Sequence, residues 1–383
     1  MQVILIGNYP RDKQESMERF AQMVSEGFRN VGVQTAIWRP LVYLGAFFQT
    51  TSGLGKWIGY IDKWVIFPAI LWWRLRKKKF NNPDVRFIVC DHSNAPYLKY
   101  LPKERSSITC HDALAIRGAF GYADAYCPAS PAGVILQKWI LRSLQNAGTL
   151  IATTQLTIDH LTSLSSGKVL KQKNWHIIPL AFNADFRRID KGEKDRLLAS
   201  VGLNSNSPFL LHVGSALPRK NRKLLIGMIA AIGDKWNGRV CFAGEALEEE
   251  LLNYAKSLGV ADRVFSIVKP SHEILRALYN GCEAFVFPSF SEGFGWPPIE
   301  AQACGAPVIA SNIPPMPEVS GVGALFADPN KPEDFADAFL TLNADSSLRN
   351  GLIQKGLKNI ERFHIDKMMS AYLKLQGINK TNV

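Results

Sequence analysis

The sequence predicts an α/β fold with two doubly wound parallel sheets. Its 383 residues, 47% of them hydrophobic, exceed what one ordinary core needs and suit two domains. Short apolar runs alternate with longer helical stretches, which is the pattern of a parallel sheet with crossover helices. This pattern occurs once before and once after a polar stretch at residues 204–208. The chain is therefore expected to contain two Rossmann-like units.

The first domain is expected over residues 1–186. Its strands are predicted at six apolar runs, residues 3–6, 33–38, 85–90, 107–110, 150–153 and 176–179. The clearest helix follows the first strand, because Phe20, Val24 and Phe28 recur on one helical face. Asp12 and Glu15 form a candidate capping box at its start.

The second domain is expected over residues 187–364. Its strands are predicted at residues 209–213, 240–243, 264–268, 284–287, 308–310 and 324–326. A charged segment at residues 184–194 is expected to link the two domains. A last helix is expected from about residue 365 to residue 375.

The most informative stretch follows the apolar strand at residues 284–287. A loop with Gly293 and Gly295 leads to a short helix that is expected to begin at Pro297 or Pro298 and to end near Gly305. Free N–H groups and the helix dipole at such an end favour anions, each by roughly 0.3–1 kcal/mol. The helix start is therefore a candidate phosphate site.

Two carboxylates flank this helix start, Glu292 in the loop and Glu300 in the helix. Both can accept hydrogen bonds from hydroxyl groups. A site that binds a diphosphate and several hydroxyl groups side by side would suit a nucleotide sugar. The alternative is that each element is structural, since glutamate near a helix start is ordinary and Gly-Phe-Gly can be only a turn.

Read together, Glu-Gly-Phe-Gly, Pro-Pro, Glu-Ala and Cys-Gly-Ala-Pro-Val-Ile-Ala-Ser within residues 292–311 resemble the signature of retaining glycosyltransferases of the GT-B fold. This is the large family of sucrose synthases and bacterial mannosyltransferases, glycosyltransferase group 1, family 4. The resemblance implies two Rossmann-like domains that face each other across a cleft, with residues 365–383 returning to the first domain. It implies transfer of a hexosyl group, with retention, from a nucleoside-diphosphate sugar to a hydroxyl of a glycan or lipid-linked glycan in cell-surface polysaccharide or glycolipid synthesis.

Residues 212–221 follow a strand and precede a helix, where a backbone turn and a cation can bind phosphate. Alone, Pro-Arg-Lys-Asn is equally typical of a surface turn. By resemblance, Lys220 matches the family lysine that binds the donor diphosphate, and Arg219 is the adjacent candidate. Many relatives have arginine directly after Gly214, where this chain has Ser215, so we expect Arg219 to take that role.

The resemblance also assigns the donor loop. Glu292 is expected to hold the sugar hydroxyls and Glu300 the ribose diol, with Gly293, Phe294 and Gly295 in the donor-binding loop. The sequence contains no Asp-x-Asp, so we expect no metal and no cofactor, and protein cations are expected to neutralise the diphosphate.

The first domain supplies candidates at the ends of three strands. His111 and Asp112 close the strand at 107–110, a carboxyl end where ligands bind. A solitary histidine is more often structural. By resemblance, however, His111 contacts the donor sugar near its anomeric carbon, and it joins Lys220 and Glu292 as the catalytic candidates.

The acceptor is expected at the same sheet edge. The candidates are Gly7 and Asn8 after the first strand, His92 and Asn94 within Asp-His-Ser-Asn after the third, and Asp112. Arg117 could reach a phosphate or pair with Asp112, and the residues alone leave both readings open.

The formal net charge is +12, and most of the excess lies in the first 185 residues. The densest cluster, residues 74–79, directly follows the apolar run at 64–73, which is shorter than the roughly 20 residues that cross a bilayer. We expect residues Trp64 to Lys79 to form an amphipathic surface that contacts anionic membrane. The alternative is a buried aromatic helix followed by solvated charge. No nucleic-acid module is present, so nucleic acid is not an expected partner.

The first residues read as a strand without a secretory signal, so we expect a cytoplasmic protein, peripheral on the inner face of the membrane. Six cysteines without a C-x-x-C pair indicate reduced core thiols. A nucleotide-dependent oxidoreductase is disfavoured because only Gly7 stands where G-x-G-x-x-G would be needed. A non-catalytic sugar-nucleotide-binding protein remains as a second alternative.

Overall fold

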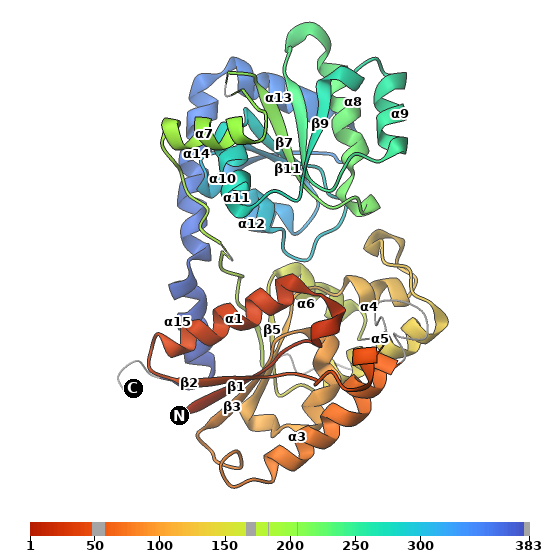
Figure 1. The fold of residues 1–383 in the computed structure, drawn as a ribbon, viewed down its shortest axis with the longest axis vertical. Helices are drawn as coiled ribbons and strands as arrows, with labels where there is room; N and C mark the ends of the chain where they lie inside the picture. Colours follow the sequence, from red (N-terminus) through yellow and green to blue (C-terminus); the bar gives the residue numbers. More distant parts are fainter. Residues whose placement is uncertain (48–57, 166–173, 183, 205, 379–383) are drawn as a thin grey trace. The chain divides into compact units, whose positions relative to one another are not determined.

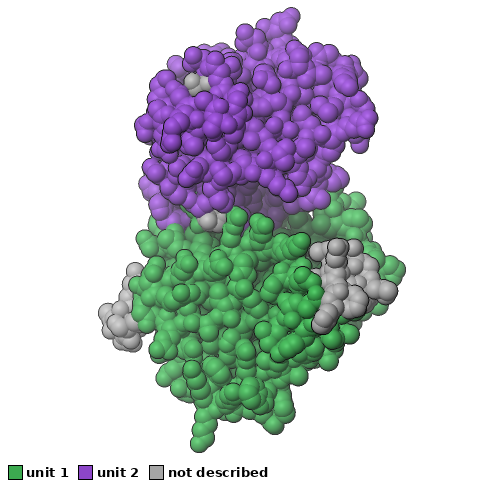
Figure 2. All heavy atoms as spheres, in the orientation of Figure 1, with its two compact units in different colours: residues 1–183, 365–383 green, residues 184–364 purple. Residues whose placement is uncertain are grey.

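The computed structural model describes residues 1–47, 58–165, 174–182, 184–204 and 206–378. The chain forms two compact units (Figures 1 and 2). Unit 1 consists of residues Met1–Asn183 and Ile365–Val383, and unit 2 of residues Ala184–His364. Each unit is an α/β structure built on a parallel sheet, as the sequence predicts.

The sheet of unit 1 has six parallel strands in the order β2-β1-β3-β4-β5-β6. The strands are β1 Gln2–Ile6, β2 Gln34–Trp38, β3 Val85–Val89, β4 Ser106–Cys110, β5 Thr149–Ala152 and β6 Trp175–Ile177. Each lies within two residues of its predicted position, because the strands appear in the sequence as short, mostly apolar runs.

In the described residues of unit 1, the α-helices with assigned bounds are α1 Glu15–Arg29, α3 Phe67–Leu75, α4 Leu114–Ala119, α5 Pro131–Gln145, α6 Gln155–Ser163 and α15 Ile365–Leu375. A π-helix, η3 Asp62–Ile66, precedes α3, and the longest 3-10 segment is η4 His92–Tyr100. Side chains from α3, α5 and α6 share one hydrophobic core with the sheet.

The last helix, α15, is part of unit 1. The hydroxyl groups of Tyr372 and Thr109 lie 2.9 Å apart, which joins α15 to β4. A Cβ added at Gly27 of α1 would lie 2.5 Å from the Met369 side chain. The two helices therefore pack closely at Gly27, where a larger residue would require the Met369 side chain to move.

The predicted capping box at the start of α1 is wrong. Asp12 lies in a separate 3-10 turn, η1 Pro10–Asp12, which ends at Lys13 in the left-handed conformation, with φ of 52°. The carboxylate of Asp12 accepts a hydrogen bond from Lys63 at 2.6 Å. Helix α1 begins at Glu15 without a side-chain cap. The turn directs the Asp12 side chain away from the helix. There it pairs with Lys63, which lies 51 residues further along the chain.

The sheet of unit 2 also has six parallel strands, in the order β12-β11-β10-β7-β8-β9. They are β7 Phe209–Gly214, β8 Arg239–Gly244, β9 Val264–Val268, β10 Ala284–Phe287, β11 Val308–Ser311 and β12 Ala324–Ala327. The helices are α7 Lys191–Ser200, α8 Arg222–Ile232, α9 Glu249–Ser257, α10 His272–Gly281, α11 Trp296–Ala303, α12 Met316–Ser320, α13 Pro332–Ala344 and α14 Ser346–Asn359. The 3-10 turn η8 Pro218–Lys220 separates β7 from α8.

Each sheet has one point at which the order of its strands reverses. In unit 1 the chain proceeds from β1 to β2 on one side and to β3 on the other, so this point lies between β1 and β3. In unit 2 it lies between β7 and β10. Open α/β sheets bind ligands outside the carboxyl ends of the strands at such points. The loops after these four strands are therefore the first places to look for a site.

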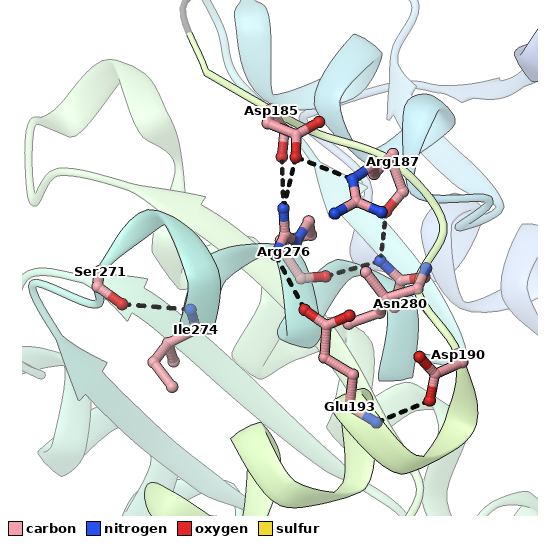
Figure 3. A network of polar contacts seen from close by, with 9 residues as sticks. Asp185, Arg187, Asp190, Glu193, Ser271, Ile274, Arg276 and Asn280 are labelled. Atoms are coloured by element: carbon pink, nitrogen blue, oxygen red, sulfur yellow. Dashed lines mark hydrogen bonds and ion pairs between the residues drawn. The ribbon is translucent and has the colours of Figure 1, made fainter.

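The charged segment that was expected to link the domains is bound to unit 2 (Figure 3). Arg276 of α10 donates hydrogen bonds to Asp185 at 2.8 Å and to Glu193 of α7 at 3.0 Å. Asn280, one turn further along α10, bonds backbone groups of residues 187 and 189. Residues 184–190 are thus held against α7 and α10.

Five of the six cysteines are buried, which agrees with the prediction of core thiols. None of the helices in the described part of the chain combines the length and apolarity that a membrane crossing requires. In the same residues, no three His, Cys, Asp or Glu side chains are grouped as metal ligands would be.

Candidate functional site

Two loops meet at the reversal point of unit 2. Asn221, at the end of η8, donates hydrogen bonds to the carbonyl oxygens of Pro288 at 3.1 Å and Pro329 at 2.7 Å. The backbone carbonyl of Arg219 accepts a hydrogen bond from the N–H of Phe290 at 2.8 Å. The loops after β7 and β10 are therefore fixed to each other by the side-chain amide of Asn221 and by one bond between main-chain groups.

The centre of this arrangement is the carboxylate of Glu292. Arg219 donates to its Oε2 at 2.8 Å, and Lys220 donates to its Oε1 at 2.7 Å. Arg219 also donates to the carbonyl of Ser291 at 2.9 Å. The structure thus brings three predicted site residues, Arg219, Lys220 and Glu292, into one ionic triad. Arg219 and Glu292 are 73 positions apart in the sequence.

Opposing effects set the charges of the triad. Burial lowers the pKa of the Lys220 ammonium, although Glu292 opposes the shift. Burial would raise the pKa of the Glu292 carboxyl, but Lys220 and Arg219 outweigh it and hold that pKa below its usual value. Two cations around one carboxylate leave one positive charge in excess, in a largely buried place. This is an environment that attracts an anion.

The glycine-containing loop leads directly into α11. Gly295 has a φ of 88°, in the left-handed region, and a Cβ there would lie 2.5 Å from Met316. The ring of the buried Phe294 packs edge-on against Phe363, with the ring centroids 5.7 Å apart. Helix α11 then begins at Trp296, one residue before the predicted start, and its N-cap residue is Gly295, which has no side chain that could cap the helix.

Glu300 does not join the triad. Its Oε2 accepts a hydrogen bond from the hydroxyl of Tyr279 on α10 at 2.9 Å. Burial, reinforced by Glu300, raises the pKa of the Tyr279 hydroxyl, so this group stays protonated and remains a donor. The sequence prediction that Glu300 holds a ribose diol is not tested by this geometry.

A buried histidine, His212 of β7, lies beneath the triad, and the sequence analysis did not assign it a role. Its Nδ1 is 3.1 Å from the carbonyl oxygen of Val286, so Nδ1 carries the hydrogen. Its Nε2 has no hydrogen-bond partner among the described residues. Burial lowers the pKa of the imidazole to about 3, so it is neutral at physiological pH. The signal in the sequence was a single polar residue inside an apolar strand.

The backbone at the end of β7 is tightly enclosed. Gly214 is paired with Gly244 at the end of β8, and a Cβ on Gly244 would lie 2.5 Å from the carbonyl oxygen of Gly214. Ser215 follows as a partly exposed residue at the start of the loop. The two facing glycines let neighbouring strand ends approach each other closely.

A second polar cluster lies at the reversal point of unit 1. Asn8, after β1, donates to Asp91, after β3, at 2.5 Å. Asn94 donates to the side-chain oxygen of Asn8 at 2.8 Å. All three residues are buried. The structure therefore brings together two of the predicted acceptor residues, Asn8 and Asn94, around Asp91.

Asp91 is the hub of this cluster, a role that the sequence did not reveal. Its carboxylate also accepts from the backbone N–H of Ser93 at 3.0 Å, and Nδ1 of His92 lies 3.2 Å away. Burial would raise the pKa of Asp91, but His92, His111 and the Asn8 hydrogen bond outweigh it, so that pKa is lowered. Asp91 is ionised in the folded protein.

His111 closes β4 beside the same cluster. Its Nε2 lies 2.9 Å from the carbonyl oxygen of Cys90, which can only accept, so Nε2 carries the hydrogen. The buried Nδ1 is then an acceptor, and it has no hydrogen-bond partner among the described residues. Burial lowers the pKa of the imidazole, against the effect of Asp91. The ring of Phe20 packs edge-on at 4.6 Å and fixes its orientation.

The remaining predicted residues of unit 1 have structural partners. Asp112 accepts the backbone N–H of Leu114 at 2.9 Å at the start of α4. Arg117 forms an ion pair with Asp124 at 2.6 Å rather than with Asp112, and its suggested contact with a phosphate stays a prediction. Gly7 lies against the side chain of Arg39. A Cβ added at Gly7 would be 3.4 Å from two atoms of that side chain.

Comparisons with known proteins agree with this site. The family described as "Glycosyl transferases group 1" matches residues 193–359. A D-inositol 3-phosphate glycosyltransferase of Actinosynnema mirum is 27% identical over 295 residues, which cover 73% of this chain and 69% of that protein. The O-antigen chain mannosyltransferase RfbU of Salmonella typhimurium is 29% identical over 263 residues, 68% of this chain and 65% of that protein.

Residues 193–359 thus match the group 1 glycosyltransferases, and the sequence relatives carry glycosyltransferase names.

Solved structures agree on the fold of the chain. Anabaena HepE, in a complex with UDP and glucose, has a TM-score of 0.73 with 14% sequence identity, and the match covers 98% of this chain and 99% of that one. An identity this low shows the fold alone, and the fold is GT-B, as the sequence resemblance predicts. The matched family region contains the triad of Arg219, Lys220 and Glu292, whereas His111 lies outside it.

Proposed function

We propose that the protein transfers a hexosyl group from a nucleoside-diphosphate sugar to a hydroxyl of a glycan or lipid-linked glycan, with retention at the anomeric carbon. The observation that carries the proposal is the buried carboxylate of Glu292 held between Arg219 and Lys220 at the reversal point of unit 2. The names of the two sequence relatives, a glycosyltransferase and an O-antigen mannosyltransferase, support a role in cell-surface polysaccharide or glycolipid synthesis.

The donor is proposed to bind through its diphosphate and its sugar. The excess positive charge of the triad and the N-terminal end of the α11 dipole favour the diphosphate. A carboxylate has about four lone-pair positions. The two cations occupy only part of this capacity at Glu292, so each oxygen can still accept a bond from a sugar hydroxyl. Glu300 with Tyr279 is proposed for the ribose diol.

Departure of the diphosphate places growing negative charge on its oxygens. Fixed cations stabilise such charge best when they need no reorganisation, and the bonds from Lys220 and Arg219 to Glu292 hold both in place before the donor arrives. We propose that these side chains supply the positive charge without a metal. The departing phosphate is proposed to take the acceptor proton, so no side chain is assigned as the base.

Unit 1 is proposed to supply the other contacts. The acceptor nitrogen Nδ1 of His111 suits a hydroxyl of the donor sugar. The ionised cluster of Asn8, Asp91 and Asn94 suits acceptor hydroxyls. The proposal includes a cytoplasmic location with peripheral contact to the inner face of the membrane, because a lipid-linked acceptor stays anchored in a bilayer.

The test is Glu292→Gln, measured as release of nucleoside diphosphate from UDP-, GDP- and ADP-sugars. Glutamine keeps the size of the side chain but removes the charge that the two cations require. We expect turnover to fall by about 10²-fold or more, by analogy with other buried charge-stabilising groups, while the thermal transition remains cooperative.

The matched control is Glu283→Gln, which removes a carboxylate that pairs with Arg349 outside the site. It should retain the turnover of the native protein. Native turnover by the Glu292→Gln variant would remove the proposed role of the triad. Binding of a nucleotide sugar by the native protein without any release of nucleoside diphosphate would favour the non-catalytic alternative.

A further inference from the structure

A helical segment of unit 1 presents two unlike faces. The backbone is helical without a break from residue 58 to residue 75, through η3 and α3. On one face, Phe67 and Leu71 are fully buried in the core, and the ring of Phe67 packs against Tyr97 with the centroids 5.0 Å apart. This face attaches the segment firmly to unit 1.

The start of the segment is fixed by a buried carboxylate. Asp62 accepts a hydrogen bond from the hydroxyl of Tyr9 at 2.7 Å. It also accepts the backbone N–H groups of Tyr43, Leu44 and Gly45 at 2.9–3.2 Å. These hydrogen bonds hold the exposed side chains of Tyr43 and Leu44 next to the helix start. The segment is therefore a rigid part of unit 1 rather than a loose appendage.

The opposite face exposes large apolar side chains. Val65 is 62% exposed, Trp72 is 53% exposed and Trp73 is 57% exposed. Ala69 is exposed between them. Residues three and four positions apart share one side of a helix, so Val65, Ala69, Trp72 and Trp73 form a continuous stripe. An exposed tryptophan pair on a rigid helix marks an interaction surface, since isolated exposed apolar residues are ordinary but a contiguous patch is not.

Basic side chains cover the rings of this stripe. The guanidinium carbon of Arg76 lies 3.8 Å from the ring centroid of Trp72. The ammonium of Lys77 lies 3.7 Å from the ring centroid of Trp73. Residues 76–79 are all basic and exposed, and the sequence from 63 to 83 contains no Asp or Glu. The surface thus combines aromatic rings with unopposed positive charge.

The chemistry of the surface favours one partner. Tryptophan is enriched where an apolar environment meets water, and clustered Lys and Arg bind anionic headgroups. Protein interfaces, in contrast, are depleted of lysine. We propose that Val65, Ala69, Trp72, Trp73 and residues 76–79, hereafter the Trp72–Trp73 face, dock unit 1 on an anionic lipid bilayer. The inference rests on the proposed function only in supplying a reason for the contact, a lipid-linked acceptor.

The face is narrower than the surface that the sequence predicts. Trp64 lies on the inner side, where its ring contacts Tyr97 and Trp139 at centroid distances of 5.1 Å. Arg74 lies over the ring of Trp38 at 4.9 Å and is partly buried. Both residues fall in the predicted range, and neither belongs to the face. The alternatives left open by the sequence, an amphipathic surface and a buried aromatic helix, are each realised on one side of the same helix.

The test is sedimentation of the full chain with vesicles of phosphatidylcholine alone and with vesicles that also contain phosphatidylglycerol. The native protein should pellet with the anionic vesicles and much less with the neutral ones. Trp72→Ala with Trp73→Ala should lower the partition coefficient about tenfold or more. Replacing residues 76–79 by glutamine should lower it by up to about fivefold per charge and remove the preference for anionic lipid.

Two matched controls isolate the face. The first is Ile135→Ala, which removes an exposed apolar side chain of α5 in the same unit. The second neutralises four exposed lysines elsewhere, Lys235, Lys256, Lys355 and Lys367. Both controls should pellet like the native protein. Calorimetric binding of a nucleoside diphosphate should be unchanged in the double tryptophan variant, which separates this inference from the proposed function.

Several outcomes would overturn the inference. Native protein that stays in the supernatant with both vesicle types would do so, as would a double tryptophan variant that pellets like the native chain. Equal binding to neutral and anionic vesicles would contradict the choice of an anionic surface. If light scattering showed that the native protein is a dimer and the tryptophan variant a monomer, the face would be a contact between two copies instead.

Discussion

Two histidines, His111 in unit 1 and His212 in unit 2, share an unusual state. His111 directly follows β4 and His212 lies within β7, and both are buried. Each bonds one ring nitrogen to a backbone carbonyl and leaves the other nitrogen without a hydrogen-bond partner among the described residues. Burial lowers the pKa of both rings. Both are therefore neutral acceptors next to the proposed binding groups, and neither can serve as a cation for a diphosphate.

The buried state of His212 makes stability depend on pH. Its pKa is about 3 in the folded protein, whereas a histidine in the unfolded chain has a pKa of about 6.5. Above pH 6.5 both states are neutral at this group and it contributes nothing. Below pH 6.5 the unfolded chain binds a proton that the folded chain does not, so the free energy of unfolding falls with pH. Between pH 6.5 and 5 this group should remove about 2 kcal/mol.

Urea unfolding at pH 7 and pH 5 measures this effect. In the His212→Asn variant, the amide can still donate to Val286, and the loss between the two pH values should be smaller by about that amount, roughly 2 kcal/mol. His364→Asn, at an exposed position, should keep the pH dependence of the native protein. An identical pH dependence in the native chain and the His212 variant would contradict a neutral, buried His212.

At the scale of elements, the sequence predicted the strands well and the side-chain partners poorly. The twelve strands of the described residues are short, mostly apolar runs, so they could be located from neighbouring residues alone. The partners of Asp12 and Arg117 and the hub role of Asp91 could not, because each depends on how a turn directs a side chain. The triad was predicted only as separate motifs, since the contact between Lys220 and Glu292 joins loops 72 residues apart.

The segment before α7 is the element whose attachment can be tested most directly. Arg276 is buried and bonds Asp185 and Glu193 at once (Figure 3). In Arg276→Ala both carboxylates lose this partner, and we expect the free energy of unfolding to fall by about 2 kcal/mol, since hydrogen bonds to charged groups are worth roughly 1.5–3 kcal/mol. Hydrogen exchange of residues 184–190 should also become faster.

Arg187→Gln is the control for this prediction. Arg187 bonds the same Asp185, but its side chain is exposed, so its loss should change little. The interpretation fails if Arg276→Ala leaves the exchange of residues 184–190 as slow as in the native chain.

At the scale of the whole molecule, ligand binding should stabilise the fold by mass action. A nucleoside diphosphate that binds the folded chain alone adds about 2.7 kcal/mol at a concentration one hundred times its Kd. We expect the nucleotide with the matching base, among UDP, GDP and ADP, to raise the Tm in the presence of EDTA. The cations that Glu292 holds should be responsible for this gain.

The variant that checks this prediction is Arg219→Gln with Lys220→Gln, which should lose the rise in Tm. Lys235→Gln with Lys256→Gln removes two exposed cations of the same unit and should keep it. A rise in Tm that appears only when a divalent ion is added, and that EDTA abolishes, would contradict a diphosphate site built from side-chain cations alone.

The return of α15 to unit 1 places both chain ends in the same unit, with unit 2 as an uninterrupted stretch between them. The chain leaves unit 1 once, forms all of unit 2 and returns, so two backbone segments connect the units. A mechanical load applied between the termini therefore acts on unit 1 and passes to unit 2 only after α15 has detached from α1 and β4.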